Sequence, residues 1–279
     1  MDSEATQSFV VAYREGKFKQ AVELCLAHLE KGLPKATSQV SSNLVDVHEI
    51  LGLAYNKLDQ FSSAIDIFNM GLQFLQQNSE HSREKAAWLK IYITETLIEL
   101  AQYKKAAEFQ DILLGEIRAD RENTLLYSHL LSTEGALKFK LGKCAEALAI
   151  LKMSRGIIEG LGLERDIRAF PIYYRLAEVL NSMAKYKEAK VLLDTLVELV
   201  EENQGKDGYL MVDVKILLGV YYYDTSLYKD ARVTLQENLE LAIKIYGEKH
   251  SKVASIYRHL SCVLYIDSDL VNSANYIKK

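Results

Sequence analysis

The sequence has little proline and glycine for its length, with 2 Pro and 14 Gly among 279 residues. All-β sandwiches and barrels need frequent turns, and these two residues are the usual choice for turns, so their scarcity argues against such folds. Hydrophobic residues make up 49% of the chain and charged residues 26%, which is typical of a folded, soluble protein. Long helices are therefore expected.

A surplus of basic charge is also missing. The formal net charge is −4, and Lys and Arg alternate with acids instead of forming the basic stripe of a nucleic-acid-binding protein. No apolar run approaches the roughly 20 residues that cross a bilayer. The first residues, MDSEATQSF, have neither the basic nor the apolar segment of a secretion signal. We expect no nucleic-acid partner and no membrane insertion.

Cysteine is scarce, and its spacing does not suggest disulfide bonds. The three residues, Cys25, Cys144 and Cys262, are odd in number and far apart in the sequence. This pattern suits free thiols in a reducing compartment. The expected localisation is cytoplasmic.

Sequence motifs that carry chemistry are absent as well. There is no CxxC, HxxxH or HExxH pattern for a metal, no GxxxxGK[ST] loop and no GxSxG turn. Residues 48–51 (HEIL) begin like a zinc-protease motif, but Gly52 stands where the second histidine is needed. Residues 160–165 (GLGLER) approach GxGxxG, but they follow a predicted helix and lack the third glycine. We expect no enzymatic activity, no catalytic residues, no metal site and no cofactor.

What the sequence does contain is an internal repeat. Seven six-residue windows resemble one another: GKFKQA (16–21), DQFSSA (59–64), AQYKKA (101–106), GKCAEA (142–147), AKYKEA (184–189), SLYKDA (226–231) and DLVNSA (269–274). Their terminal alanines, from Ala21 to Ala274, are 43, 42, 41, 42, 42 and 43 residues apart. A period this regular indicates a repeated structural unit.

Each unit has the pattern of two helices joined by a turn. A small residue lies 12 positions before the alanine in most copies, as at Gly52, Gly135, Ala177 and Gly219. Small side chains at both places let two helices approach closely. Five copies have an aromatic residue three positions before the alanine, which we expect to fill the bend: Phe18, Phe61, Tyr103, Tyr186 and Tyr228.

These residues resemble the tetratricopeptide repeat (TPR). Residues 51–68 (LGLAYNKLDQFSSAIDIF) have its Leu-Gly pair, Tyr, aromatic, Ala and Phe at the usual offsets. The period is longer than the TPR length of about 34 residues, and this length, with the linker YGEKHSKVASIYRHLSCVLY (246–265), resembles the kinesin-light-chain type.

The resemblance implies an all-α fold, a right-handed α-solenoid of helix–turn–helix units. We expect a single array over residues 1–279, with about six complete repeats and a truncated seventh. The expected repeats are approximately 4–32, 44–78, 83–120, 124–160, 168–204, 209–247 and 250–279. Because the last one ends five residues after Ala274, we expect the natural chain to continue or to have been cut within a helix.

The resemblance also implies a binding surface, because the first helices of TPR proteins line a concave peptide groove. The candidate groove residues are Asn56, Lys57, Trp88, Tyr92, Glu95, Tyr174, Arg175, Glu178, Asn181 and Tyr223. Polar members such as Asn56, Lys57, Arg175 and Asn181 can hydrogen-bond a peptide backbone or carboxylate. The apolar members are equally well explained by packing between neighbouring first helices.

One subtype of TPR function is disfavoured. Some TPR proteins hold the C-terminal carboxylate of chaperones with Lys and Asn at set groove positions. The corresponding positions here are Ile50, Tyr92, Thr133, Arg175 and Leu217. The residues needed for that carboxylate clamp are therefore missing.

The expected function is that of a non-catalytic scaffold or adaptor that binds a peptide segment of a partner in the concave groove. One alternative is a structural or self-associating subunit of a larger complex. Another is a regulatory TPR arm of a longer chain, which could be an enzyme. In each case the partner is a protein or peptide whose identity the sequence leaves open.

Overall fold

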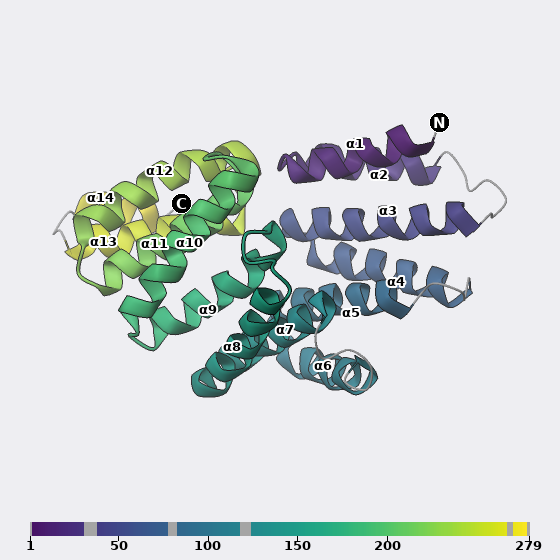
Figure 1. Ribbon diagram of the computed structural model, residues 1–279. Coiled ribbons are helices and arrows are strands. Elements are labelled where there is room, and N and C mark those ends of the chain that lie inside the picture. Colours follow the sequence, from purple (N-terminus) through teal and green to yellow (C-terminus); the bar gives the residue numbers. More distant parts are fainter. Residues whose placement is uncertain (1, 31–37, 78–82, 118–123, 267–269, 278–279) are drawn as a thin grey trace. The chain divides into compact units, whose positions relative to one another are not determined.

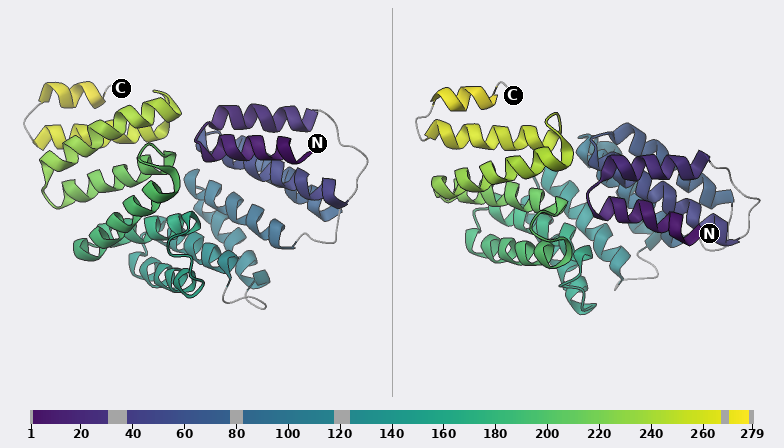
Figure 2. Two further views of the ribbon diagram at one scale, coloured as in Figure 1. Left: turned by 45° about the horizontal axis from the view of Figure 1, so that its top comes forward. Right: turned by 90° about the horizontal axis from the view of Figure 1, so that it is seen from above.

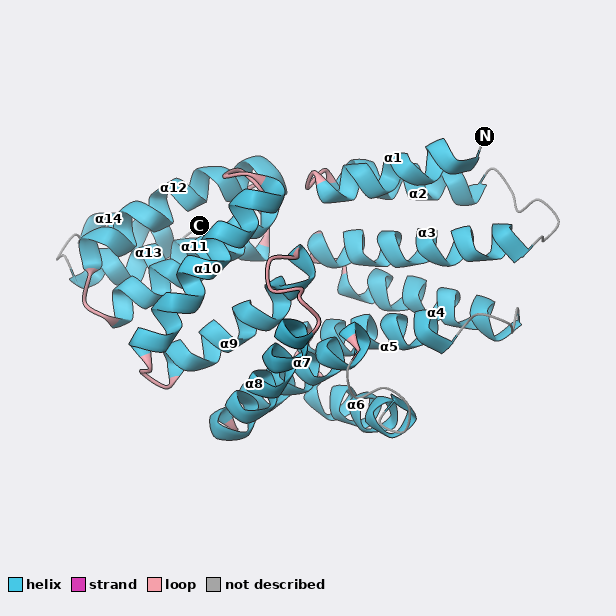
Figure 3. Cartoon of the chain, viewed as in Figure 1, coloured by secondary structure: helices cyan, strands magenta, loops and turns pink. Residues whose placement is uncertain are grey.

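The computed structural model describes residues 2–30, 38–77, 83–117, 124–266 and 270–277 (Figure 1). Within these ranges the chain forms fourteen α-helices and one 3-10 helix, and no strands (Figure 3). The all-α class that the TPR resemblance implies is confirmed.

The α-helices are α1 (Asp2–Arg14), α2 (Phe18–Glu30), α3 (Ser38–Lys57), α4 (Phe61–Gln77), α5 (Arg83–Glu99), α6 (Tyr103–Ile117), α7 (Leu125–Lys140), α8 (Cys144–Gly160), α9 (Phe170–Ser182), α10 (Tyr186–Gln204), α11 (Tyr209–Asp224), α12 (Tyr228–Tyr246), α13 (Ser251–Ile266) and α14 (Leu270–Ile277). The 3-10 helix, η1 (Ile167–Ala169), precedes α9.

The helices pack as antiparallel pairs, each odd-numbered first helix against the even-numbered second helix that follows it (Figures 1 and 2). The chain divides into two compact units, Met1–Leu161 (unit 1, α1–α8) and Gly162–Lys279 (unit 2, α9–α14). Within each unit, neighbouring first helices also contact one another. The expectation of one array over residues 1–279 stays a prediction.

The turn inside each described pair has one backbone conformation. The residue five positions before the conserved alanine has a positive φ in all six described turns: Gly16, Asp59, Ala101, Gly142, Ala184 and Ser226. The next N–H bonds the carbonyl five residues earlier, as from Gln60 to Tyr55 at 2.9 Å and from Leu227 to Tyr222 at 2.7 Å. This is the Schellman ending of a helix, for which glycine is preferred. Only two of the six residues are glycine.

The core is formed by matched small and large side chains. The conserved alanines from Ala21 to Ala231 are fully buried. A Cβ atom built on Gly52 would lie 2.3 Å from the ring of Phe68, and one built on Gly219 would lie 2.5 Å from Leu235. The large residue thus fills the space that the glycine leaves. The first repeat reverses the sizes, with Phe9 at the small position and Cys25 at the large one, both buried in one cluster.

The seventh repeat corrects the sequence register by one residue. Ala274 was expected to be the buried alanine, but it is exposed, whereas Ser273 is 4% exposed. Helix α14 begins three residues before Ser273, as the other second helices begin three residues before their alanines. The Ser273 hydroxyl donates to the carbonyl of Ser261 at 2.9 Å. Because serine is nearly as small as alanine and its hydroxyl is satisfied, it fits the same buried position.

The same correction applies nine residues before the small residue, where Tyr55 and Tyr222 stand in the second and sixth repeats. Counted from Ala274 this position falls on Tyr265, which is 67% exposed, whereas counted from Ser273 it falls on Leu264, which is buried. Tyr265 therefore belongs to the predicted binding surface instead of the core.

Candidate functional site

The candidate site is the surface of the first helices predicted from the TPR resemblance. We define the first-helix face of a unit as the residues 7, 8, 11, 14, 15 and 18 positions before the buried Ala or Ser of each repeat. In unit 1 it is built on α1, α3, α5 and α7, and in unit 2 on α9, α11 and α13. Each unit is described separately.

Glu49 and Tyr92 join neighbouring first helices in unit 1. The Tyr92 hydroxyl donates to Glu49 Oε1 at 3.0 Å. Burial raises the pKa of the Glu49 carboxyl, while the hydrogen bond from Tyr92 lowers it in part. Burial also raises the pKa of Tyr92 well above its ordinary value, with Glu49 contributing in the same direction. Tyr92 is therefore committed to contacts within the unit.

Two more polar pairs cross the same face. Asn56 Nδ2 donates to Thr96 Oγ1 at 2.8 Å, and the Thr96 hydroxyl lies 3.2 Å from Asn56 Oδ1. The Thr133 hydroxyl donates to Glu95 Oε1 at 3.2 Å. Thr96 has one hydroxyl proton, and its Oγ1 also lies 2.6 Å from the Tyr92 carbonyl oxygen, so the Asn56 interaction is chiefly the bond that its NH₂ group donates. One oxygen of Glu95 likewise has a partner on the adjacent first helix.

The aromatic candidate of unit 1 also packs internally. The Trp88 ring lies 4.9 Å from the ring of His129 on α7 and 6.0 Å from the ring of Tyr92. Lys57, half-buried, is the last residue of α3. The structure therefore brings Asn56, Trp88, Tyr92 and Glu95 together as links between repeats.

Asn181 is different, because its side chain is only partly satisfied. It lies on α9 and is 4% exposed. Its Nδ2 donates to Asp224 Oδ2 on α11 at 2.7 Å. A carboxylate only accepts hydrogen bonds, so the NH₂ group must face Asp224 and the amide oxygen must point elsewhere. That oxygen, Oδ1, has no hydrogen-bond partner among the described residues.

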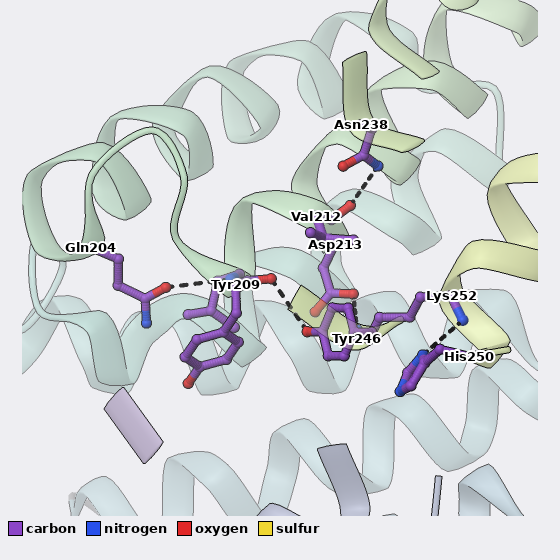
Figure 4. Close-up of polar contacts among 9 residues, drawn as sticks. Gln204, Tyr209, Val212, Asp213, Asn238, Tyr246, His250 and Lys252 are labelled. Atoms are coloured by element: carbon purple, nitrogen blue, oxygen red, sulfur yellow. Dashed lines mark hydrogen bonds and ion pairs between the residues drawn. The ribbon is translucent and has the colours of Figure 1, made fainter. Parts of the chain in front are cut away.

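A buried carbonyl without a partner is uncommon and costs about 1–3 kcal/mol. Asn238 Oδ1 shares this property, but its amide donates at 3.0 Å to the Val212 carbonyl, between the first and second helices of one repeat (Figure 4). Gln110 similarly donates to the Leu130 carbonyl at 2.8 Å. Both lie on second helices. Asn181, in contrast, lies on the first-helix face of unit 2.

Of the remaining candidates of unit 2, three precede Asn181 on α9 and one lies on α11. Tyr174, Arg175 and Glu178 are half-buried residues of α9, and the Tyr174 ring stacks on Phe170 at 5.7 Å. Tyr223, half-buried on α11, lies 5.8 Å from the ring of Tyr228.

The register error in the seventh repeat hid a further part of this face. With Ser273 as the reference, α13 contributes Ser255, Arg258, His259, Cys262, Tyr265 and Ile266. Tyr265 then occupies the register position of Asn181 and Tyr223. Counting the mean period of 42 from Ala231 would have identified Ser273.

An ion pair recurs at one register position in both units. Lys85 Nζ lies 2.5 Å from Asp46 Oδ1 in unit 1, and Lys252 pairs with Asp213 in unit 2 (Figure 4). In unit 2, the backbone N–H of Lys252 also donates to Nδ1 of His250 at 3.2 Å, which caps α13 (Figure 4). These contacts hold adjacent first helices in register and explain part of the 246–265 linker pattern.

Within the described ranges, no group of three or more His, Cys, Asp or Glu side chains could hold a metal ion. No described helix has the length and apolar character that a membrane span requires.

Comparison with models of known families and with curated proteins finds no match. Solved structures do share the fold. The Rap conjugation gene regulator of plasmid pLS20, solved with the Phr* peptide, has a TM-score of 0.77 at 15% identity, covering 97% of this chain and 70% of that chain. The apo quorum sensor NprR from B. thuringiensis has a TM-score of 0.65 at 19% identity, covering 98% and 73%.

A putative kinesin light chain of Podospora anserina with TPR-like repeats has a TM-score of 0.50 at 15% identity, covering 73% of this chain and 96% of that chain. Together with the helix pairs, the left-handed turns and the buried alanines, these likenesses define the class of fold. This chain has the fold of the TPR-type helical repeat proteins, as residues 51–68 predict.

Proposed function

We propose that this protein is a non-catalytic adaptor that binds a peptide segment of a partner on the first-helix face of unit 2. The observation that carries the proposal is the Asn181 carbonyl, which is buried on this face and lacks a donor among the described residues. This oxygen has almost no solvent-accessible surface, so a ligand reaches it only when the side chains that cover it move aside. A peptide backbone supplies N–H donors at regular intervals, and one of them would then satisfy the oxygen.

Asp224 supports the role of Asn181 as a fixed acceptor. Its hydrogen bond to Nδ2 holds the amide in one orientation, so the peptide would meet a preorganised group and less side-chain entropy would be lost on binding. Arg175 and Tyr174, also on α9, are the proposed flanking contacts. The fold is compatible with this use, because the pLS20 Rap regulator that shares it was solved with the Phr* peptide.

The proposed compartment is the cytoplasm. The three cysteines are free in the structure. Burial raises the pKa of Cys25 to about 12, so this thiol stays protonated and unreactive. Free thiols support a reducing location.

The test is selection of binders from a phage-displayed library of random short peptides on the full chain. The selected peptides are then titrated by fluorescence anisotropy against wild type, Asn181→Ala and Asn203→Ala. Asn203 is an exposed asparagine on α10 whose amide donates to the Leu199 carbonyl at 2.8 Å, so its variant is a matched control.

We expect Asn181→Ala to weaken binding by about tenfold or more, because one buried hydrogen bond is lost, and Asn203→Ala to bind like wild type. A thermal melt and circular dichroism establish that each variant is folded. If Asn181→Ala is folded and binds every selected peptide as wild type does, the proposal is wrong.

A further inference from the structure

Asp224 is a carboxylate without a cationic partner. It is exposed and is the last residue of α11. Its Oδ2 accepts the hydrogen bond from Asn181 at 2.7 Å, and no ion pair joins it to a Lys, Arg or His among the described residues. Neutral amides orient a carboxylate but do not balance its charge.

The position of Asp224 in its helix makes this charge unfavourable for the isolated fold. The C-terminal end of a helix carries partial negative charge, so an acid is disfavoured there and a cation is favoured. The following backbone N–H groups cannot compensate, because Thr225, Ser226 and Leu227 donate to carbonyls of Tyr221, Tyr223 and Tyr222 to close the turn. A carboxylate and a helix end thus act together to attract a cation.

Tyr223 precedes Asp224 on α11 and is half-buried on the same first-helix face. The pKa of Tyr223 is raised, first by burial and then by its neighbours Cys262, Tyr228 and Asp224. The ring is therefore a neutral phenol at physiological pH, and Cys262 of α13 is one of its neighbours. Neutral tyrosine rings attract cations through their negative faces.

The same surface continues over α13. Cys262 and Ile266 are four residues apart and share one face of this helix. Ile266 is 40% exposed and Tyr265 is 67% exposed. Asp224, which bonds Asn181, lies 43 residues after it, on the next first helix. Ile266 likewise lies 43 residues after Tyr223, on the next first helix. By this register we expect Ile266 to form an apolar margin next to Tyr223, on the side away from Asn181.

We propose that this surface, formed by Asp224, Tyr223 and Ile266, receives an arginine side chain of the bound peptide. The inference rests on the proposed function of Asn181. The guanidinium would donate to the carboxylate oxygen of Asp224 that Asn181 does not occupy, while its plane and methylene stem lie against Tyr223 and Ile266. Arginine suits this arrangement better than lysine, because its planar group stacks on a ring while it hydrogen-bonds a carboxylate.

The basic residues of the unit lie elsewhere along the first helices. Arg258 is 15 positions before Ser273, whereas Asp224 is 7 positions before Ala231. The difference of 8 residues corresponds to about 12 Å along the helix direction. Arg175, 14 positions before Ala189, is displaced in the same direction. At the positions seven and eight residues before the buried Ala or Ser, Asp224 is thus the one charged residue of unit 2, and no first-helix cation lies at that level.

The test uses the peptides selected on the full chain and asks whether they carry arginine. One selected peptide is synthesised with its arginine and with citrulline, which has the same shape and no charge. Both forms are titrated against wild type, Asp224→Asn and Asp230→Asn. Asp224→Asn still accepts from Asn181, but it removes the charge and puts an NH₂ group, which cannot accept, in place of the second oxygen. Asp230, exposed on α12 outside this face, provides the matched control.

We expect arginine to be enriched, and citrulline or Asp224→Asn to weaken binding by about tenfold each. The two changes combined should cost little more than either alone, because they remove the same contact. Asp230→Asn should have no effect. If the peptides depend on Asn181 but lack arginine, or ignore Asp224→Asn, this inference is wrong and the proposed function stands. If no peptide depends on Asn181, both are wrong.

Discussion

The first-helix faces of the two units are built on the same repeat, yet their polar side chains are used differently. In unit 1, Glu49 accepts from Tyr92, and Asn56 donates to the Thr96 hydroxyl, which also lies 3.2 Å from Asn56 Oδ1. In unit 2, Asn181 donates to Asp224 but its carbonyl has no partner in the described part of the chain, and Asp224 has no cation there.

The register makes the contrast direct, because Asn56 and Asn181 occupy the same position, eight residues before the buried alanine. One has both amide atoms in contact with a threonine, and the other has only its NH₂ group bonded. Asparagine at one repeat position thus joins neighbouring helices in unit 1, whereas in unit 2 it keeps an acceptor without a partner among the described residues. Of the predictions below, those for glycine and for the turn residues compare equivalent positions in the two units, and the one for Glu49 concerns unit 1 alone.

The largest effect on stability is expected at the glycine that faces the second helix. A Cβ on Gly52 would meet three atoms of the Phe68 ring at 2.3–2.7 Å, whereas one on Gly219 would meet the Cδ2, Cγ and Cδ1 atoms of the buried Leu235 at 2.5–3.1 Å. A leucine side chain can change rotamer more readily than a rigid ring can shift. In unit 2, Ala177 stands at the position equivalent to these glycines, 12 residues before Ala189, and it is fully buried. We expect Gly52→Ala to lower the free energy of unfolding by about 2 kcal/mol, after the gain in helix propensity.

Gly219→Ala is the matched variant, and we expect it to cost less than about 1 kcal/mol. Urea titrations followed by circular dichroism measure both. Equal costs for the two variants would contradict the packing difference between Phe68 and Leu235.

A smaller, pH-dependent effect is expected at Glu49 in unit 1. Because burial raises its pKa in the folded state above the ordinary value of 4.5, its contribution to stability is fully present below about that value. It is lost as the pH rises through the folded-state pKa. Glu49→Gln keeps an acceptor for Tyr92 and cannot ionise. It should therefore match wild type at pH 4 and exceed it by up to about 1 kcal/mol at pH 7.

Urea titrations at several pH values give this difference in unfolding free energy. The control is Glu99→Gln, an exposed acid of α5, for which we expect no such trend. A Glu49→Gln difference that is the same at both pH values would show that this carboxyl is not perturbed by burial.

The smallest effect should be the same in both units. Ala101 and Ala184 have φ values of 56° and 55°, a left-handed conformation that costs a non-glycine residue roughly 1–2 kcal/mol. Since glycine loses more entropy on folding, each Ala→Gly change should stabilise its unit by about 0.5–1 kcal/mol. Gly142→Ala should destabilise by a similar amount. Chemical denaturation checks all three, and an Ala→Gly variant that is destabilised would contradict the turn geometry.

Much of the fold can be predicted from the sequence, because close packing of the helices restricts which residues can occupy certain repeat positions. Close helix packing admits only small residues at the position of Ala21, Ala64 or Ala231, and these are fully buried. The seventh repeat shows the limit of this signal. Serine is small enough for the same place, so the alanine pattern alone points to Ala274 instead of Ser273. Four turn residues adopt the left-handed conformation without being glycine, so the sequence did not identify them: Asp59, Ala101, Ala184 and Ser226.

The candidate site was predicted less completely. The register brings residues such as Glu49 and Tyr92 onto facing positions, but it does not decide which of them bond one another. Whether Asn56 or Asn181 has a free acceptor depends on the neighbour one repeat later, Thr96 in one case and Asp224 in the other. Side-chain geometry of that kind is set by tertiary packing, which the repeat pattern alone does not encode.

The most direct measurement is the affinity of one selected peptide for Asn56→Ala and for Asn181→Ala, determined by titration calorimetry on the full chain. The two substitutions are chemically identical and occupy the same register position in units 1 and 2. We predict that Asn56→Ala binds within about twofold of wild type and that Asn181→Ala binds about tenfold or more weakly. Equal affinities, or a loss confined to Asn56→Ala, would contradict the assignment of the binding face to unit 2.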